Sequence, residues 1–181
     1  MQSQTNDTHS AVPDAASLRS PQIADGVRLW QLAKDSQVLD VNSSYSYLLW
    51  CRDFSDTTIV AESAGDVVGF VSGFMRPQSP TTLFVWQVAV DRAQRGRGLG
   101  VAMLNRLLDT TAAHTLETTI SPDNTASIAM FTALARRRDT SISKQTLFSA
   151  DNFPDSHQPE DLYTVGPMDQ LTKEHADNDN L

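Results

Sequence analysis

The sequence contains little of several features that define whole classes of proteins. A single cysteine, Cys51, occurs among 181 residues, so an internal disulfide framework is impossible. No apolar run approaches the roughly 20 residues of a membrane-spanning helix, and no membrane partner is expected. Positive charge is scarce, because 14 Lys and Arg face 22 Asp and Glu, for a net charge of −8. A nucleic-acid partner is not expected either, since duplex binders present a basic face.

Signals for export and for metal binding are missing as well. The N-terminal stretch "MQSQTNDTHSAVPDAAS" is polar and lacks the apolar core of a signal peptide, which favours a cytoplasmic protein. No cluster of His, Cys and carboxylates has the spacing of metal ligands, so no metal is expected. Polar residues dominate 1–16 and 169–181, and this composition predicts mobile tails around a single domain over 17–168.

Between these tails, segments with helical periodicity alternate with strand-like runs. Helices are expected over 22–36, 41–54, 99–113 and 121–137, and strands over 57–63, 66–75, 82–90, 115–120, 141–149 and 161–167. Ile23, Val27 and Trp30 have helical spacing in the first helix, and Tyr45, Leu48, Leu49 and Arg52 share one face of the second. Asn42 and Ser43 are the candidates for the cap of that second helix. The turn "AGD" joins the first two strands as a plausible hairpin. Strands outnumber helices and the first pairs look antiparallel. The predicted fold is therefore an α/β (α+β) domain with a mixed, mostly antiparallel central sheet flanked by helices.

Positive charge and glycine gather at one place, "QRGRGLG" (94–100), between an apolar run (83–90) and a helix-like run (99–111). Glycines let backbone N–H groups approach a ligand closely, and the helix N-terminus adds a partial positive charge. An anion is the ligand expected at such a junction. The pattern predicts a phosphate-binding loop.

Several kinds of glycine-rich loop compete for this stretch. A P-loop would require a lysine and a hydroxyl residue after the last glycine, and neither is present. A dinucleotide fingerprint has the spacing Gly-x-Gly-x-x-Gly early in a βαβ unit, whereas here Gly96, Gly98 and Gly100 follow several strands. An ordinary tight turn is the remaining structural alternative.

The stretch Arg95-Gly96-Arg97-Gly98-Leu99-Gly100, after "VAVD", resembles motif A of the GCN5-related N-acetyltransferase (GNAT) family. The resemblance implies acetyl-CoA as co-substrate, with its pyrophosphate on the loop amides. The residues implied for the cofactor in this loop are Arg95, Gly96, Arg97, Gly98 and Gly100.

A second stretch, "NTASIAMFTAL" (124–134), resembles a helix of the same family that also contacts the cofactor, and here Asn124, Ser127 and Phe131 fall at the matching positions. Many members have a tyrosine where this chain has Phe131, and its hydroxyl protonates the departing thiolate. Phenylalanine has no proton to donate. Another hydroxyl, water or direct thiolate release must then serve. Ala135-Arg136 also replaces the Gly-Phe that usually ends this helix.

In such a site a neutral amine attacks a thioester carbonyl, and a donor must stabilise the oxyanion that forms. The family uses a backbone N–H on the strand before the loop, which implies an amide near Val88 or Val90 for both the thioester and the oxyanion. No covalent intermediate is required, and Cys51 is expected to be a buried structural thiol. The general base stays open between Glu62, on a strand expected near the centre of the sheet, a water chain, and His157 in the loop "PDSHQPED".

The stretch 41–63, together with Asp40 and residues 84–90, resembles family members that acetylate a small amino acid carrying a second amine. The resemblance implies substrate-binding roles for Asp40 and Tyr45. A partly buried Asp40 carboxylate would hold an ammonium, and Tyr45 would hydrogen-bond or stack on it. Strict alternation places Trp86 on one face of its strand with Val88 and Val90, where it could form one wall of the acetyl or amine pocket.

Structural alternatives exist for these three residues: Asp40 as a helix-flanking acid, and Tyr45 and Trp86 as core packing. Two other functions also stay open. One is acetylation of a different amine, such as a protein N-terminus, a polyamine or a drug. The other is a non-catalytic acetyl-CoA sensor, which Phe131 makes conceivable. A homodimer is expected from the apolar C-terminal runs "TLF" and "LYTV", which could leave a strand edge to pair.

Overall fold

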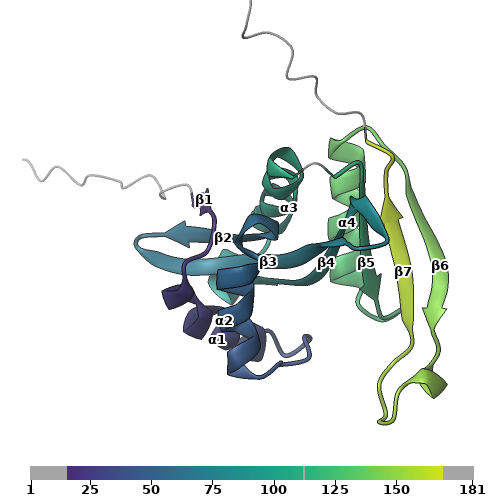
Figure 1. Cartoon of the computed structure of the whole chain (residues 1–181), viewed down its shortest axis with the longest axis horizontal. Coiled ribbons are helices and arrows are strands. Elements are labelled where there is room, and N and C mark those ends of the chain that lie inside the picture. Colours follow the sequence, from purple (N-terminus) through teal and green to yellow (C-terminus); the bar gives the residue numbers. More distant parts are fainter. Residues whose placement is uncertain (1–15, 112, 169–181) are drawn as a thin grey trace, which may run out of the picture.

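The computed structural model describes residues 16–111 and 113–168 (Figure 1). The expected tails fall outside this range, apart from Ala16. The strands are β1 (Ser17–Arg19), β2 (Thr58–Ser63), β3 (Asp66–Arg76), β4 (Ser79–Val90), β5 (Thr115–Ile120), β6 (Ile142–Phe148) and β7 (Glu160–Val165). The helices are α1 (Gly26–Ser36), α2 (Ser44–Asp53), α3 (Leu99–Thr110) and α4 (Thr125–Arg137), with short 3-10 turns η1 (Ile23–Asp25), η2 (Ser55–Thr57), η3 (Arg92–Gln94) and η4 (Ala150–Asn152).

All seven strands form one sheet in the order β1-β2-β3-β4-β5-β7-β6. Neighbouring strands are antiparallel except β4 and β5, which run parallel and are joined through α3. The predicted hairpin between β2 and β3 is confirmed, with Ala64 and Gly65 at positive φ in its turn. The mixed, mostly antiparallel sheet is confirmed. The short edge strand β1 was not predicted.

Helices cover both faces of the sheet (Figure 1). Helices α1 and α2 pack on one face, where Leu29, Tyr47 and Phe70 belong to a fully buried cluster. Helices α3 and α4 contribute to the other, larger cluster, which contains Met103 and Leu134. Burying apolar side chains on both faces is the main stabilising term of such a layered domain.

The helical faces that the apolar spacing suggested for the first two helices are not the ones buried. Ile23 and Val27 are 55% and 63% exposed, while α1 buries Leu29, Leu32 and Ala33. In α2 the face that carries Tyr45 and Leu48 points outward, and the buried residues are Tyr47, Trp50 and Cys51. Both helices carry apolar residues around most of their circumference, so periodicity alone did not select the inner face. Ser43 is the N-cap of α2, as its sequence predicted.

A β-bulge in β4 overturns the strict alternation expected for this strand. Ser72 pairs with Gln87 but Gly73 pairs with Val85, which leaves Trp86 as an extra residue. A Cβ on Gly73 would lie 2.5 Å from the Phe84 carbonyl oxygen, so the crossing is this close only because residue 73 is glycine. Trp86 therefore turns to the α2 side, where its ring lies 5.2 Å from that of Trp50.

Strands β4 and β5 are no longer paired beyond this bulge. They pair only over Thr82–Val85 and Thr115–Thr118. Beyond this ladder β5 continues beside β7 as far as Ile120, while β4 continues beside β3 to Val90. The edge of β4 that faces β5 is thus open over residues 86–90, which include Val88 and Val90. Backbone N–H groups on this edge have no partner in β5 and can bind a ligand.

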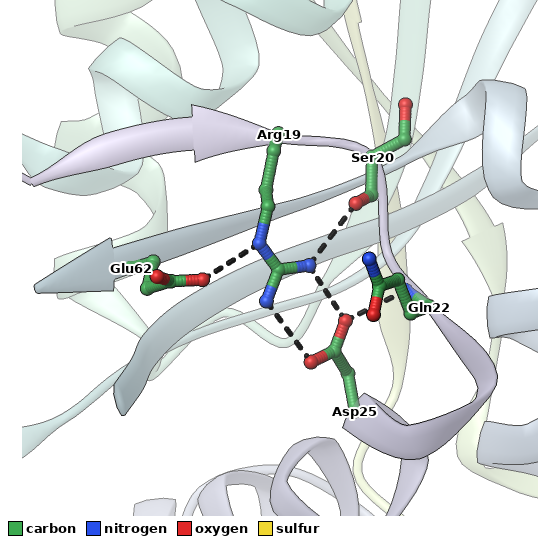
Figure 2. Close-up of polar contacts among 5 residues, drawn as sticks. All are labelled: Arg19, Ser20, Gln22, Asp25 and Glu62. Carbon is green, nitrogen blue, oxygen red and sulfur yellow. Dashed lines mark hydrogen bonds and ion pairs between the residues drawn. The ribbon is translucent and has the colours of Figure 1, made fainter. Parts of the chain in front are cut away.

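The N-terminal edge of the sheet is fastened by one arginine (Figure 2). Arg19 on β1 donates from Nε to Glu62 on β2 at 2.7 Å, and from its two terminal nitrogens to both carboxylate oxygens of Asp25 at 2.8 and 3.1 Å. Burial raises the pKa of Asp25, but hydrogen bonds from Arg19 and from the Gln22 backbone N–H outweigh it, so the pKa lies below its usual range. The cluster joins the edge strand, η1 and β2.

Replacing Arg19 with Met should lower the free energy of unfolding by about 1–2 kcal/mol, because two half-buried carboxylates lose their shared donor. The stability that Asp25 contributes is present above about pH 4 and is lost as the pH falls through its lower folded-state pKa. Urea titrations at pH 7 and pH 3.5 should show a smaller acid loss in R19M than in the original chain. Arg52→Met is the matched control, because the Arg52–Asp53 pair is exposed and joins sequence neighbours; an equal effect in both variants would contradict the structural role of Arg19.

Candidate active site

A pocket of about 540 Å³ opens where three segments distant in sequence meet. They are the connection between α1 and α2, the start of α4, and the C-terminal loop that leads into β7. The lining residues are Gln37, Val38, Asp40, Ser121, Asp123, Asn124, Thr125, Ala126, His157, Gln158 and Glu160. Because β4 and β5 are parallel, the loop that follows each of them begins at the same edge of the sheet. This is where parallel strands usually offer a ligand site.

Two residues predicted separately from sequence meet in this pocket. The His157 Nε2 atom lies 2.9 Å from an Asp40 carboxylate oxygen, although 117 positions separate the two. The other ring nitrogen lies 2.6 Å from the Gln158 carbonyl oxygen, and the ring stacks on Phe153 at 4.2 Å between centroids. Since both nitrogens face acceptors, the Gln158 carbonyl and then the Asp40 carboxylate raise the pKa of His157 above its usual value.

The pocket is acidic. Asp40, Asp123 and Glu160 line it, and burial raises the pKa of the Glu160 carboxyl. The expectation of a partly buried Asp40 is wrong, because its side chain is 84% exposed and lies at the pocket rim. An acidic lining of this kind favours a cationic guest such as an ammonium group.

Gln87 ties the Asp40 segment to the sheet. This β4 residue is 4% exposed, and its side-chain amide donates from Nε2 to the Asp40 carbonyl oxygen at 2.8 Å. Its Oε1 accepts from the hydroxyl of Tyr47, a fully buried residue of α2, at 3.1 Å. One buried side chain thus connects β4, α2 and the pocket rim.

The glycine loop has the geometry of an anion site. Gly96 and Gly98 adopt positive φ of 76° and 73°, and a Cβ at either would meet nothing within 4 Å. Gly98 is the N-cap of α3 and supplies no side-chain cap, so the first-turn amides of the helix stay open for a ligand. Arg95 and Arg97 are exposed beside these amides.

The start of this loop is held by α1. The Arg28 guanidinium donates to an Asp91 carboxylate oxygen at 2.8 Å and to the Val67 carbonyl oxygen at 2.9 Å. Asp91 in turn accepts from the Ala93 backbone N–H at 3.0 Å and so caps η3. The Arg95 side chain folds back onto the Val90 carbonyl oxygen at 3.1 Å. The loop is therefore anchored at its entry while Gly96 and Gly98 remain exposed.

The second family stretch forms the beginning of α4. The Asn124 side chain caps the helix by accepting from the Ser127 backbone N–H at 3.1 Å. Asn124 also lines the pocket. Phe131 is 2% exposed and belongs to the core cluster, so it supports the site from below and offers a ligand almost no surface. A Cβ on Gly100 would lie 2.5 Å from the Met130 sulfur, so glycine at this position lets the Met130 side chain of α4 pack tightly on α3.

Four other residues singled out in the sequence lie away from the pocket lining. Tyr45 is 64% exposed and Trp86 is 52% exposed, so neither is core packing. Glu62 is bound to Arg19 on β2, one strand from the sheet edge, and the expectation of a central position for it is wrong. Cys51 is buried as predicted, and burial raises the pKa of its thiol to about 11, so it is a poor nucleophile.

Sequence reasoning missed three contributors to this site: Asp123, Glu160 and Gln87. Glu160 lies in "QPEDLY", close to His157, and an acid directly before a strand near a candidate histidine was the available signal. Gln87 gave a weaker signal, an amide inside an apolar strand. Among residues 16–111 and 113–168, no group of three or more His, Cys, Asp or Glu is placed to hold a metal ion. Within the same residues, no helix combines the length and apolarity needed to cross a membrane.

Comparison with known proteins identifies similar enzymes. The chain is 61% identical over 158 residues to the L-2,4-diaminobutyric acid acetyltransferase of Nocardia farcinica, covering 86% of this chain and 82% of that protein. It is 40% identical to the enzyme of the same name from Marinococcus halophilus, covering 93% and 99%.

A solved structure agrees with these relatives. The diaminobutyrate acetyltransferase EctA from Paenibacillus lautus, in complex with its substrate L-2,4-diaminobutyric acid and coenzyme A, superposes with a TM-score of 0.80 at 41% identity. The match covers 84% of this chain and 95% of that one. A model of the acetyltransferase (GNAT) family matches residues 26–135. The open edge of β4, the glycine loop and these matches together establish that the chain belongs to the GNAT acetyltransferase family.

Proposed function

We propose that this chain transfers the acetyl group of acetyl-CoA to the 4-amino group of L-2,4-diaminobutyrate, giving N4-acetyl-L-2,4-diaminobutyrate. The observation that carries the proposal is the pairing of two oppositely charged sites at one sheet edge. An arginine- and glycine-rich loop suited to a pyrophosphate follows β4, and an acidic pocket suited to an ammonium lies beyond β5. The names of the relatives at 61% and 40% identity support the same substrate.

In this proposal the cofactor lies along the open edge of β4. Loop residues 95–100 and the first turn of α3 hold the pyrophosphate, and Asn124 and Ser127 flank it from α4. A backbone N–H at Val88 or Val90 binds the thioester carbonyl and stabilises the oxyanion. The edge of β4 that is free of β5 pairing over residues 86–90 supports this placement.

The amine substrate occupies the acidic pocket. Asp40 holds an ammonium group of the substrate at the pocket rim, and the exposed rings of Tyr45 on α2 and Trp86 on β4 lie outside the pocket lining, where they meet only a part of the substrate that extends beyond the pocket. The 4-ammonium group of the substrate first loses one proton to give a neutral amine, which attacks the thioester carbonyl carbon and forms a tetrahedral intermediate. The nitrogen loses a second proton as the amide forms. Collapse of that intermediate breaks the carbon–sulfur bond and releases the coenzyme A thiolate. Two groups in the pocket can accept the amine proton: neutral His157 and the carboxylate of Glu160, whose pKa burial raises.

The setting of the enzyme is part of the same proposal. The product is an intermediate toward ectoine, a compatible solute that supports osmoadaptation, and the need for acetyl-CoA supports a cytoplasmic location. One acetyltransferase domain spans residues 17–168.

A homodimer that pairs along β6 is supported by its place at the sheet edge, where Leu147 and Phe148 are exposed. The "LYTV" run lies inside the sheet, between β5 and β6, and offers no edge.

Thiol release from acetyl-CoA should be fastest with L-2,4-diaminobutyrate when it is compared with ornithine, lysine, spermidine and a peptide amine. The spacing between Asp40 and the open edge of β4 should suit one chain length best. NMR of the product should place the acetyl group on N4. Preference for another amine would replace the substrate, and cofactor binding without any turnover would favour the sensor that the missing hydroxyl at Phe131 permits.

Gly98→Asp should raise the dissociation constant for acetyl-CoA at least tenfold, because it adds a negative charge and a side chain where the pyrophosphate approaches. Isothermal titration calorimetry measures this directly. The matched control is Gly65→Asp, since Gly65 also has positive φ and open surroundings but lies in the β2–β3 turn. Equal affinities in the two variants would remove the loop from the cofactor site.

The amine KM should fall as the pH rises from about 6 to about 8, because protonated His157 and the substrate ammonium compete for Asp40. His157 carries its charge below its raised pKa and loses it above, so the competition ends as the pH rises. Steady-state kinetics of His157→Asn should show an amine KM nearly independent of pH in this window. His114→Asn, at an exposed histidine on another part of the surface, is the control. A pH-dependent KM that persists in H157N would rule out the competition.

A further inference from the structure

We propose that Gln87 is a positioning residue that fixes the amine-binding segment around Asp40 relative to the thioester-binding strand β4, and so sets the affinity for the amine substrate. The inference rests on the proposed function, in which Gln87 contacts neither acetyl-CoA nor the amine. It gives Gln87 a role in determining how the amine is bound. Its basis is a pair of hydrogen bonds, one buried and one partly buried, that connect the pocket rim to the sheet.

The chemistry of the neighbours fixes the orientation of the Gln87 amide. The Asp40 carbonyl can only accept a hydrogen bond, so the amide nitrogen has to face it, at 2.8 Å. The amide oxygen then faces the Tyr47 hydroxyl, which donates at 3.1 Å. Gln87 and Tyr47 are 4% and 0% exposed, so water has little access to replace a lost partner.

The Asp40 segment has few other hydrogen bonds to the rest of the chain, although the neighbouring Leu39 packs on the buried cluster beneath α1 and α2. Ser36, at the end of α1, accepts from the backbone N–H groups of Val38 and Leu39 at 3.3 and 3.2 Å, within three residues. The Asp40 carboxylate reaches across the pocket to His157, a loop residue. Among the hydrogen bonds of the described residues, the one from Gln87 joins the Asp40 backbone to the sheet.

The bulge in β4 explains why Gln87 can act on both substrates' sites. Because Trp86 is the extra residue, Trp86 and Gln87 both face the α2 side, and Val88 returns to the α3 side. The side chain that holds Asp40 is therefore adjacent in sequence to the strand segment whose amides are proposed to bind the thioester. The Gln87 hydrogen bond sets the separation between the ammonium site and the acyl carbon.

The test compares three variants in steady-state kinetics with acetyl-CoA and L-2,4-diaminobutyrate. Gln87→Met keeps the length of the side chain and loses both hydrogen bonds. Gln87→Glu keeps an acceptor for Tyr47 but loses the donor to Asp40. Tyr47→Phe removes only the bond between Tyr47 and Gln87. Amine KM should rise about tenfold in both Gln87 variants, as expected for one buried hydrogen bond, and threefold or less in Y47F. The KM for acetyl-CoA should stay within twofold throughout.

The pH profile separates positioning from a general structural role. A buried glutamate at position 87 has a raised pKa, and its protonated form regains an O–H donor toward the Asp40 carbonyl. The ratio of amine KM between Q87E and the original chain should therefore fall as the pH is lowered from about 8 to about 6. Thermal unfolding of each variant provides a check on folding.

Three outcomes count against the inference. Amine KM unchanged in Q87M and Q87E, with normal turnover in the original chain, overturns the role of Gln87 alone. Parallel increases in both KM values, with a pH-independent ratio for Q87E, assign Gln87 to fastening α2 onto the sheet. Absence of diaminobutyrate turnover in the original chain overturns the proposed function and this inference with it.

Discussion

The early parting of β4 from β5 is the constraint on which the rest of the site depends. A continuous parallel ladder would consume the backbone groups of both strands and close the sheet. Here pairing stops after Val85 and Thr118, and a bulge enforced by the close crossing at Gly73 turns β4 away. The separation leaves one strand edge open for a thioester and places the loops that follow both strands around it. Cofactor loop and substrate pocket both derive from this one opening.

The charge distribution follows the same geometry. The chain is strongly acidic overall, yet Arg92, Arg95 and Arg97 all lie in the short segment that follows the open edge of β4. Arg28 neutralises Asp91 at the entry to this segment, so the nearest carboxylate does not oppose an incoming phosphate. The acidic groups at the other side of the opening come from three separate segments. Each ligand thus meets charge of the opposite sign, which aids both binding and orientation.

Local sequence patterns predicted most of the fold. Strand-loop-helix order, the hairpin turn and the cap at Ser43 depend on neighbouring residues, and all could be predicted. The inner faces of α1 and α2 could not, because apolar residues such as Ile23, Val27 and Leu48 extend beyond the core-facing stripe. The bulge at Trp86 depends on how β4 pairs with β3, and the alternation of apolar residues within β4 alone does not reveal it. Of the site, the glycine loop was visible in one stretch, whereas the meeting of Asp40 with His157 arises only from tertiary contacts.

Phe131 narrows where proton transfer can occur. A tyrosine at this position would offer an acid to the departing thiolate from the α4 side, but this phenylalanine is buried in the core and has no hydroxyl. Starting from the ammonium form, the nitrogen releases two protons, one before the attack and one as the amide forms, and the reaction consumes one only if the thiolate is protonated as it leaves. On the function proposed for this chain, the two groups that can accept the amine proton are His157 and Glu160, both on the pocket side. The proton can pass from amine to pocket to solvent while coenzyme A departs as the thiolate, so the chemistry does not require an acid on α4. The absence of that hydroxyl is therefore compatible with turnover. Proton transfer then depends on His157 and Glu160, in and next to the C-terminal loop.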